Sequence, residues 1–420
     1  MKKLTAIILV LVMAFSLMSC GEKDTDAKKD KVDEKPGKVE DLSKSSTQET
    51  PKPEELLKVI QNPDGFQKGY RNFNAKLLAE CYQGETMMVS PFSLYAALGM
   101  LGNGASGETL KEMEQLFGCN VEEASKAVLY LMLRSEEADV IRIADSIWIE
   151  DDTPVNDAFL SRCGLYYRSS VMRAHLSADS TIQKINDWVN EHTKGRIEKI
   201  LDKIDDDAVM VLLNAITFDG KWEETFNSGS TNDQGEFYTA NGEKKTMEMM
   251  FGGADRYFED SDMIGMEKDY RDGYCFRAYL PKEGKTVRDI IGKLAESQNL
   301  PYQGASEINL LMPKFKGETT LPLEQTLQTM GMKAAFSPSS SDFSEMSTLP
   351  GIYVSKVLQK TYIKVDEEGT EAAAVTAIVA NTESFDPNRI VRNVYLDHPF
   401  IYEIVDTESG ITLFTGVFEG

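Results

Sequence analysis

Residues 362–384 read YIKVDEEGTEAAAVTAIVANTES, and the rest of the chain is best understood from this stretch. It begins with Ile363 and Val365 alternating against charged neighbours, which is typical of a strand. Glu367-Glu368-Gly369 then predicts a turn. A run of small and β-branched residues without Pro or Gly follows. We therefore expect a strand, a turn and then a segment that is able to become a second strand.

The run after Gly369 separates by parity into two sets. The uncharged set is Thr370, Ala372, Ala374, Thr376, Ile378, Ala380 and Thr382. The set that carries every charge is Glu371, Ala373, Val375, Ala377, Val379, Asn381 and Glu383. Since successive strand residues face opposite sides of a sheet, the first set predicts a slim face that can be buried inside packed strands. Pattern alone leaves an ordinary strand or an alanine-rich helix open.

Composition narrows the classes of partner. The chain has 420 residues, 41% of them hydrophobic, which is enough for one large domain or two smaller ones. Its net charge of -23 argues against nucleic acid and against electrostatic binding to anionic lipid. Only three His residues are present, which limits metal and acid–base chemistry. We expect no metal site and no cofactor.

The N-terminal residues have the features of an export signal. Lys2 and Lys3 precede an apolar core over residues 7–17 that is too short to span a bilayer. The core ends in Leu17-Met18-Ser19-Cys20, which resembles a bacterial lipobox. Residues 1–20 are thus predicted to be a lipoprotein signal peptide, with Cys20 lipidated as the mature N-terminus. A plain signal peptide is the alternative.

Beyond Cys20 the sequence predicts a tether and then one globular domain. Residues 21–53 are rich in charged residues, Ser, Thr and Pro, so we expect a flexible linker. No second linker or repeat follows, and residues 54–420 are interpreted as a single domain. The remaining cysteines have no CxxC spacing and specify no pairing; they are Cys81, Cys119, Cys163 and Cys275.

Strands and helices are mixed without regular alternation, which predicts an α+β fold rich in antiparallel sheet. Ser90-Pro91 is a natural helix start. Residues 209–218 form an apolar run typical of a strand covered on both faces, so Asn214 inside it must be hydrogen-bonded. The other expected elements are helices at 66–78, 181–200 and 287–296, a strand at 143–149 and a hairpin at 398–418.

The sequence contains partial matches to enzyme motifs, but the surrounding residues do not fit those motifs. Gly102 to Gly107 match GxGxxG but follow a helix pattern, and Glu108 stands where a P-loop requires Lys. No GxSxG elbow is present, and Glu191-His192 is not part of HExxH. We therefore expect that the chain is not an enzyme and has no catalytic residues.

Several blocks of the sequence resemble the serpin family, in the order of that family. They are 366–374 (DEEGTEAAA), 90–93 (SPFS), 104–109 (GASGET), 185–189 (INDWV), 213–222 (LNAITFDGKW), 397–401 (DHPFI) and 414–416 (FTG). The resemblance covers about residue 54 to the end. It implies the serpin fold, with three β-sheets, eight or nine helices and an exposed reactive-centre loop.

The resemblance also implies a function. The chain would be an irreversible suicide inhibitor of serine, or else cysteine, endopeptidases, trapping the acyl-enzyme when its loop inserts into sheet A. The implied hinge residues are Glu367, Gly369, Thr370, Glu371, Ala372, Ala373 and Ala374. The implied shutter and breach residues under and above sheet A are Ser90, Ser93, Asn214, Gln359 and Trp222. Gln359 replaces a His common in the family, so pH sensitivity through that residue is lost.

Counting from the hinge predicts Glu383–Ser384 as the reactive bond, and hence a protease with a basic specificity pocket. An elastase-like or subtilisin-like enzyme cutting at Ala380 or Thr382 is the alternative. The shortest loops of the family would suggest Asn388, but Pro387 before it is a poor bait residue. The implied protein is a monomer, exported and anchored by lipid at the bacterial surface or released, whose partner is the target protease. A non-inhibitory serpin acting as carrier, chaperone or surface-binding protein is the competing function.

Overall fold

The computed structural model describes most of the chain, and all the described residues belong to one compact unit, Pro36–Gly420. The described ranges are 38–43, 50–62, 64–297, 300–370 and 389–420. The signal peptide with Cys20, most of the predicted tether and the reactive bond lie outside them. So do Glu371, Ala372, Ala373 and Ala374 of the hinge.

Sheet A is built around a strand without exposed residues. β5 (Met210–Phe218) is buried throughout, as its apolar run predicts. It pairs antiparallel with β3 (Ile141–Glu150) and parallel with β13 (Lys356–Val365). The strand order is β1-β4-β3-β5-β13-β12, completed by β1 (Glu40–Asp41), β4 (Ser170–Ala174) and β12 (Phe315–Pro322). After the buried Phe315, β12 alternates between exposed and partly buried residues, as expected of an edge strand with one solvated face.

β1 differs from the expectation of a flexible tether over residues 21–53. The Leu42 amide donates to the Val171 carbonyl at 2.8 Å, and Arg173 pairs with Glu40 at 2.9 Å. These contacts add Glu40–Asp41 to the outer edge of β4. Sequence composition missed this segment because the hydrogen bonds come from the backbone of a distant strand.

The other two sheets carry the C-terminal part of the chain. Sheet B has the order β2-β16-β15-β10-β9-β8: Met87–Val89, Ile411–Phe418, Phe400–Asp406, Tyr274–Pro281, Met263–Asp269 and Arg256–Glu259. Its β15–β16 pair confirms the predicted hairpin. Sheet C has the order β14-β11-β7-β6: Val391–Tyr395, Glu307–Pro313, Lys244–Gly253 and Asn232–Tyr238. An α+β fold with three sheets is therefore confirmed.

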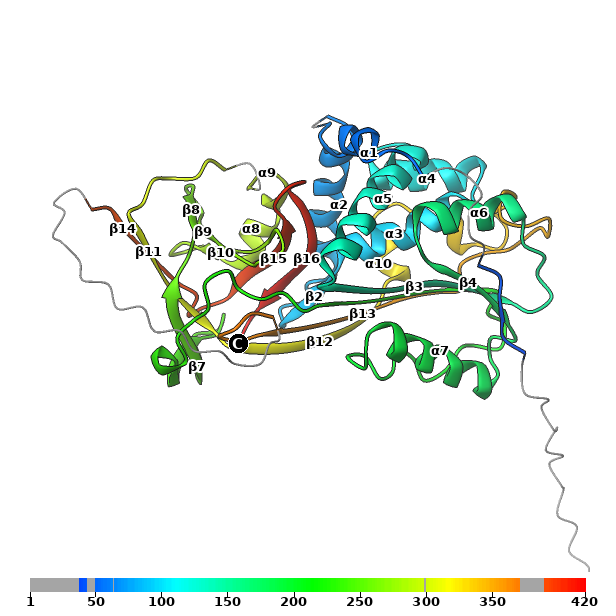
Figure 1. The fold of residues 1–420 in the computed structure, drawn as a ribbon. Helices are drawn as coiled ribbons and strands as arrows, with labels where there is room; N and C mark the ends of the chain where they lie inside the picture. Colours follow the sequence, from blue (N-terminus) through cyan, green and yellow to red (C-terminus); the bar gives the residue numbers. More distant parts are fainter. Residues whose placement is uncertain (1–37, 44–49, 63, 298–299, 371–388) are drawn as a thin grey trace, which may run out of the picture. The chain divides into compact units, whose positions relative to one another are not determined.

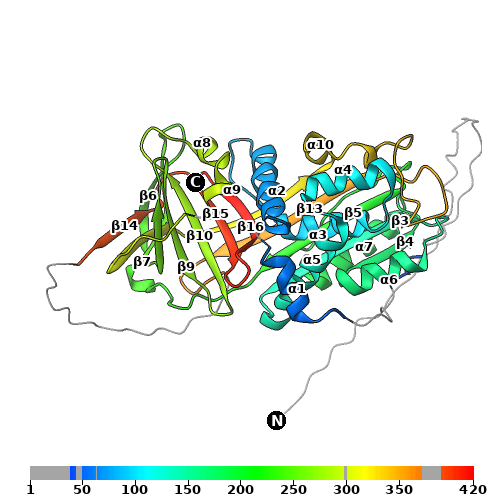
Figure 2. The same ribbon diagram turned by 90° about the horizontal axis from the view of Figure 1, so that it is seen from above.

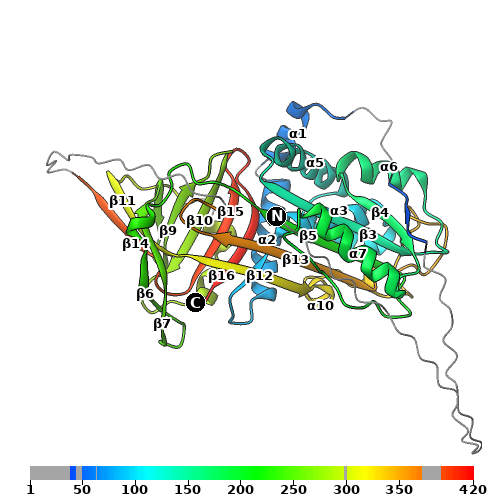
Figure 3. The same ribbon diagram turned by 60° about the horizontal axis from the view of Figure 1, so that its bottom comes forward.

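Helices cover both faces of sheet A. Figure 1 shows α7 (Asp179–His192) on one side of the sheet, opposite α3 (Pro91–Gly102) and α5 (Val121–Ala138). The view from above shows α3 and α5 over the strands, and the turned view shows α7 in front of β3 and β5 (Figures 2 and 3). The remaining helices are α1 (Pro53–Ile60), α2 (Phe66–Cys81), α4 (Gly107–Phe117), α6 (Asp157–Tyr166), α8 (Val287–Ile291), α9 (Leu294–Ser297) and α10 (Glu324–Thr329).

Several predicted helix boundaries can be compared with the structure. Ser90 caps α3 as predicted, since its hydroxyl accepts a hydrogen bond from the Ser93 amide. α7 ends at His192, before the predicted residue 200, because Lys194 and Gly195 adopt positive φ angles of 50° and 81°. The predicted helix at 287–296 is two short helices, α8 and α9.

The number of helices slightly exceeds the expectation. The described residues contain ten α-helices against the eight or nine expected, and α9 has only four residues. None of the described helices combines the length and hydrophobicity that crossing a bilayer requires.

Candidate functional site

The centre of sheet A contains a polar cluster at the seam between β5 and β13. Asn214 and Gln359 lie directly opposite each other there, and both are fully buried. The Gln359 Nε2 group donates to Asn214 Oδ1 and, at 2.9 Å, to the Ser90 carbonyl. Gln359 Oε1 accepts from the Ser90 amide at 2.8 Å. The side chain of Gln359 thus joins β13 both to β5 and to the start of α3.

A carboxyl completes the cluster on the other side of β5. Asp145 lies opposite Asn214 on β3, and its Oδ1 accepts from Ser93 Oγ at 2.9 Å and from Asn214 Nδ2. Asn214 Nδ2 also donates to Ser93 Oγ. The structure therefore brings together all four predicted shutter residues and adds Asp145. Their functional role in sheet opening stays a prediction.

Asp145 is not among the predicted site residues, although the sequence of the predicted strand 143–149 indicates a buried polar group at this position. Ile143, Ile147 and Ile149 share its parity, so a carboxyl interrupts a row of apolar side chains. Such an interruption indicates a buried polar partner. Burial raises the pKa of Asp145 well above its usual value, against the opposing effect of the hydrogen bonds from Ser93 and Asn214. The cluster thus contains a titratable group, even though Gln359 cannot titrate.

Trp222 covers the end of sheet A at which β5 and β13 both finish, which is called the top of the sheet below. Its indole is fully buried and stacks on Tyr270, with ring centroids 4.1 Å apart and planes 9° apart. The indole Nε1 donates to the Asp366 carbonyl at 2.9 Å, and the Trp222 amide donates to the Glu368 carbonyl at 3.0 Å. Trp222, predicted as a breach residue, is therefore in direct contact with the turn that follows β13.

The first hinge residues are part of this contact with Trp222. This corrects the expectation that Thr370 belongs to an exposed loop. A hinge residue at the start of an exposed loop would itself be exposed, but Thr370 is fully buried. Its amide donates to the Gly220 carbonyl at 2.6 Å, and its hydroxyl lies 2.9 Å from the Tyr270 hydroxyl. Gly369 makes this placement possible, because it pairs with Lys221 at a φ of 150°. Thr370 is therefore not part of an exposed loop.

Glu367 is held by several groups. Its carboxylate accepts from Thr231 Oγ1 at 2.8 Å and pairs with Lys314 at 3.2 Å. Burial acts to raise the pKa of Glu367, but the hydrogen bonds from its own backbone and Thr231 and the charge of Lys314 outweigh burial, so the pKa lies below its usual value. The turn is thus fixed to Thr231, just before β6, and to Lys314, which connects β11 with β12.

One group of side chains in the described part of the chain has the residue types of a metal site. Glu150, Asp151 and His175 place ligand atoms within 4.8 Å of one another. Asp151 and His175 are exposed, and exposed acidic groups gather in this way without binding an ion. This group supports no metal site.

Replacing Gly369 with Ala tests the hinge geometry. A Cβ there would lie 2.2 Å from the Gly220 carbonyl oxygen and 2.7 Å from Lys221 Cα, both backbone atoms, at a strained φ. We expect Gly369→Ala to cost about 1–3 kcal/mol and to lower the thermal midpoint. Gly304→Ala is the control, since nothing lies within 4 Å of its Cβ position. Equal midpoints for the two variants would contradict the geometry.

Replacing Asp145 with Asn tests the buried acid. A pKa raised on folding gives stability that is present below the unfolded value and lost as pH rises through the folded value. Asp145→Asn removes this loss and should be the more stable protein by about 1–3 kcal/mol at pH 8, with a smaller difference at pH 5. Thermal melts from pH 5 to 8 measure this, with exposed Asp152→Asn as control. A difference independent of pH would be the contrary result.

Comparison with known proteins agrees with this architecture. A family model described as Serpin (serine protease inhibitor) matches residues 68–419. Serpin B8 of Homo sapiens is 30% identical over 360 residues, covering 82% of this chain and 95% of that protein. An uncharacterized serpin-like protein of Thermococcus kodakarensis is 30% identical over 339 residues, with 78% and 79% covered. The crystal structure of the thermophilic serpin tengpin in the native state has a TM-score of 0.79 at 30% identity, covering 91% of this chain and 99% of that one. With its three sheets and a family match over most of its length, this chain belongs to the serpin family.

Proposed function

We propose that this serpin is a suicide inhibitor of an endopeptidase that inserts the segment after Thr370 between β5 and β13. The observation that supports this most directly is the seam itself. β5 and β13 pair with each other over residues 356–362, so no strand separates them there. The described part of the hinge ends at Thr370, whose amide donates to the Gly220 carbonyl just beyond the end of β5. The segment that would insert between β5 and β13 therefore starts next to the end of their pairing.

The direction of insertion favours the new strand. β5 and β13 are parallel to each other, and parallel pairing is slightly less stable per residue than antiparallel pairing. A strand that runs from Thr370 back along the seam would be antiparallel to both neighbours. It would replace one parallel ladder with two antiparallel ladders, which is β-strand addition within one chain. The uncharged parity from Thr370 to Thr382 suits the buried face of such a strand.

The chemistry belongs to the protease. Attack by its nucleophile on the Glu383 carbonyl would form an acyl-enzyme and release the chain that begins at Ser384. Insertion of about 15 residues at roughly 3.3 Å each would then move the tethered enzyme about 50 Å. Distortion of its catalytic site at the end of this movement would stop deacylation. Until cleavage, a kinetic barrier keeps the seam closed.

The setting is also part of the proposal. Cys20 would carry the lipid that holds the protein at a bacterial surface, and the residues after it would provide reach. The folded domain would then lie outside the cell, where the target protease acts. Metabolic labelling with a fatty acid, lost in Cys20→Ser, tests the anchor.

Two arginine variants test insertion. Thr370 is unsuitable, because it is already buried and its replacement would disturb the starting state. Ala372→Arg places a charge on the uncharged parity, which costs several kcal/mol if the charge is buried without a partner. Ala373→Arg, on the parity that carries the charges, is the matched control. We expect Ala372→Arg to be cleaved as a substrate and Ala373→Arg to form SDS-stable complexes.

The same experiment identifies the bond. A glutamyl endopeptidase, an elastase and a subtilisin are each mixed with the protein, and the released N-terminus is sequenced. Ser384 supports Glu383 as the bait residue, whereas Asn381 or Glu383 moves the specificity to small side chains. Equal complex formation by both arginine variants would refute insertion.

Cleavage of the loop without a trapped protease gives an independent prediction. An inserted strand of roughly a dozen residues, at about 1 kcal/mol for each net hydrogen bond, adds on the order of 10 kcal/mol. The melting midpoint of the nicked protein should therefore rise sharply above that of the intact protein. Equal midpoints would favour the non-inhibitory carrier or chaperone instead.

A further inference from the structure

We propose that Tyr270 is a positioning residue, which sets the register in which the segment after Thr370 inserts between β5 and β13. The inference rests on the proposed function and adds to it a residue next to sheet B. Tyr270 directly follows β9, and its hydroxyl lies 2.9 Å from the Thr370 hydroxyl. Tyr270 is 3% exposed, and Thr370 is fully buried. The contact therefore holds the Thr370 side chain turned toward the core.

Gly220 makes this contact possible. The Thr370 amide donates to the Gly220 carbonyl at 2.6 Å. The Tyr270 ring packs so closely on the same residue that a Cβ on Gly220 would lie 3.1 Å from Tyr270 Cδ1. Gly220 is thus in contact with both partners, and its missing side chain leaves the space in which the ring lies. A larger residue at this position would displace the ring from the hinge.

The Tyr270 ring is held in place independently of the hinge. It stacks on Trp222, and Phe218 packs edge-on against it, with ring centroids 5.0 Å apart and planes at 73°. Its backbone amide donates to the Tyr274 carbonyl at 2.9 Å, just beyond the last pair of β9 and β10. None of these contacts involves residues 367–370. The hydroxyl is therefore a fixed point against which Thr370 is placed.

The orientation of Thr370 decides which residues an inserted strand would bury. Successive strand residues face opposite sides of a sheet, so a shift of one residue exchanges the two faces. With Thr370 turned inward, the residues buried with it belong to the uncharged set that ends at Thr382. With Thr370 turned outward, the buried set would contain Glu371 and Glu383, and burial of unpaired carboxylates is strongly unfavourable. The contact with Tyr270 would thus select the correct face before insertion begins.

The Thr370 side chain depends on the Tyr270 hydroxyl. Among the described residues it forms one hydrogen bond, and Tyr270 is the partner. Loss of one partner leaves the other buried and unsatisfied, which favours an outward turn of Thr370 toward solvent. Replacement of both partners by apolar groups of the same shape is nearly neutral. The single variants Tyr270→Phe and Thr370→Val should therefore both release the hinge, and the double variant should keep it in place.

Hydrogen exchange of the full chain tests the contact without a protease. The Thr370 amide is bonded to Gly220 and should exchange slowly in the unaltered protein. In Tyr270→Phe and in Thr370→Val it should exchange about tenfold faster, the effect of one buried hydroxyl without a partner. The double variant should exchange like the unaltered protein. Tyr274→Phe is the matched control, because Tyr274 also packs on Phe218, at 5.7 Å, and its hydroxyl has no hydrogen-bond partner among the described residues.

The stoichiometry of inhibition tests the register. A protease that forms SDS-stable complexes with the unaltered protein is titrated, and the stoichiometry counts the chains consumed for each enzyme trapped. Tyr270→Phe should raise this number by about threefold or more, because loops that start in the wrong register are released as cleaved substrate. The rate of the first encounter should stay unchanged, since the bait residues are intact. Thr370→Val should act in the same way, and the double variant should restore the stoichiometry.

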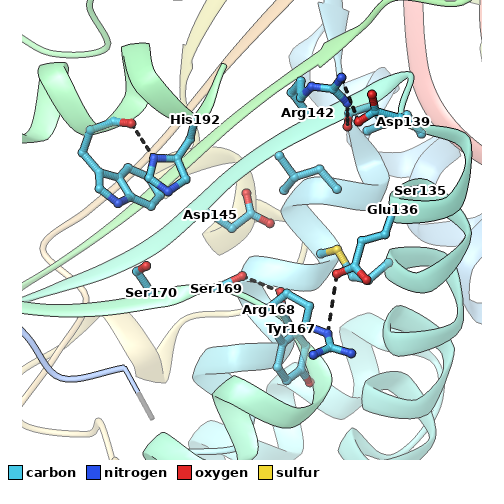
Figure 4. A pocket seen from close by; sticks show the side chains of 14 residues that line it. Ser135, Glu136, Asp139, Arg142, Asp145, Tyr167, Arg168, Ser169, Ser170 and His192 are labelled. Atoms are coloured by element: carbon cyan, nitrogen blue, oxygen red, sulfur yellow. Dashed lines mark hydrogen bonds and ion pairs between the residues drawn. The ribbon is translucent and has the colours of Figure 1, made fainter. Parts of the chain in front are cut away.

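Tyr167→Phe controls for a general loss of stability. Tyr167 lies beside the cavity next to β3 (Figure 4). Its buried hydroxyl lies 2.6 Å from the Ser125 hydroxyl and accepts from Asn103 Nδ2 at 2.9 Å. Removal of this hydroxyl should lower the melting midpoint and leave both the exchange of the Thr370 amide and the stoichiometry unchanged.

The outcomes separate this role from the proposed function. Unchanged exchange in Tyr270→Phe, or an equal rise in stoichiometry in Tyr167→Phe, would overturn the role of Tyr270. Complexes with an unchanged stoichiometry in both single hinge variants would also overturn it and leave the proposed function intact. If the unaltered protein forms no complex with any protease tested, the proposed function fails and this role with it. Because Thr370→Val breaks the same bond from the hinge side, the result does not depend on the folding of Tyr270→Phe.

Discussion

The direct pairing of two parallel strands, β5 and β13, is the constraint on which the rest of this structure depends. Both strands are largely buried, and the bond from Gln359 to Asn214 crosses the seam between them. Helices cover the two faces, so the seam can change only if strands slide apart between packed layers. The proposed insertion would therefore have to pass from this closed arrangement to an expanded one, with little room for states between them.

The polar cluster makes the closed arrangement specific. Hydrogen bonds connect Ser90, Ser93, Asp145, Asn214 and Gln359, from four different elements, in the middle of an apolar core. A buried network of this kind is strong when all its members are satisfied and costly when one is removed. Separation of β5 from β13 would break the Gln359–Asn214 bond before a new strand could replace it. In the proposed mechanism the cluster would therefore contribute to the barrier as well as to the stability.

Much of this arrangement, although not all of it, can be predicted from the sequence. The parity of residues 370–382 and the apolar run at 209–218 predict the segment for insertion and the strand beside it, because both depend on local periodicity. Asp145, β1 and the burial of Thr370 could not be predicted in the same way. Each depends on partners far away in the chain: Ser93 and Asn214, the backbone of β4, and Gly220 with Tyr270. The reactive bond at Glu383–Ser384 stays a prediction from counting.

The buried position of Thr370 has a consequence for the speed of insertion. Growth of an ordered segment is usually limited by its first contact, which fixes the chain before the contacts that reward it are made. Here the first residue is already in place, with its amide and hydroxyl bonded at the top of the seam. If the loop is cut and inserts as proposed, insertion would be elongation from an existing nucleus, and each further residue would add hydrogen bonds as it is fixed. The race between a serpin and its protease would then be set by the rate of propagation along the seam, with no search for a starting point.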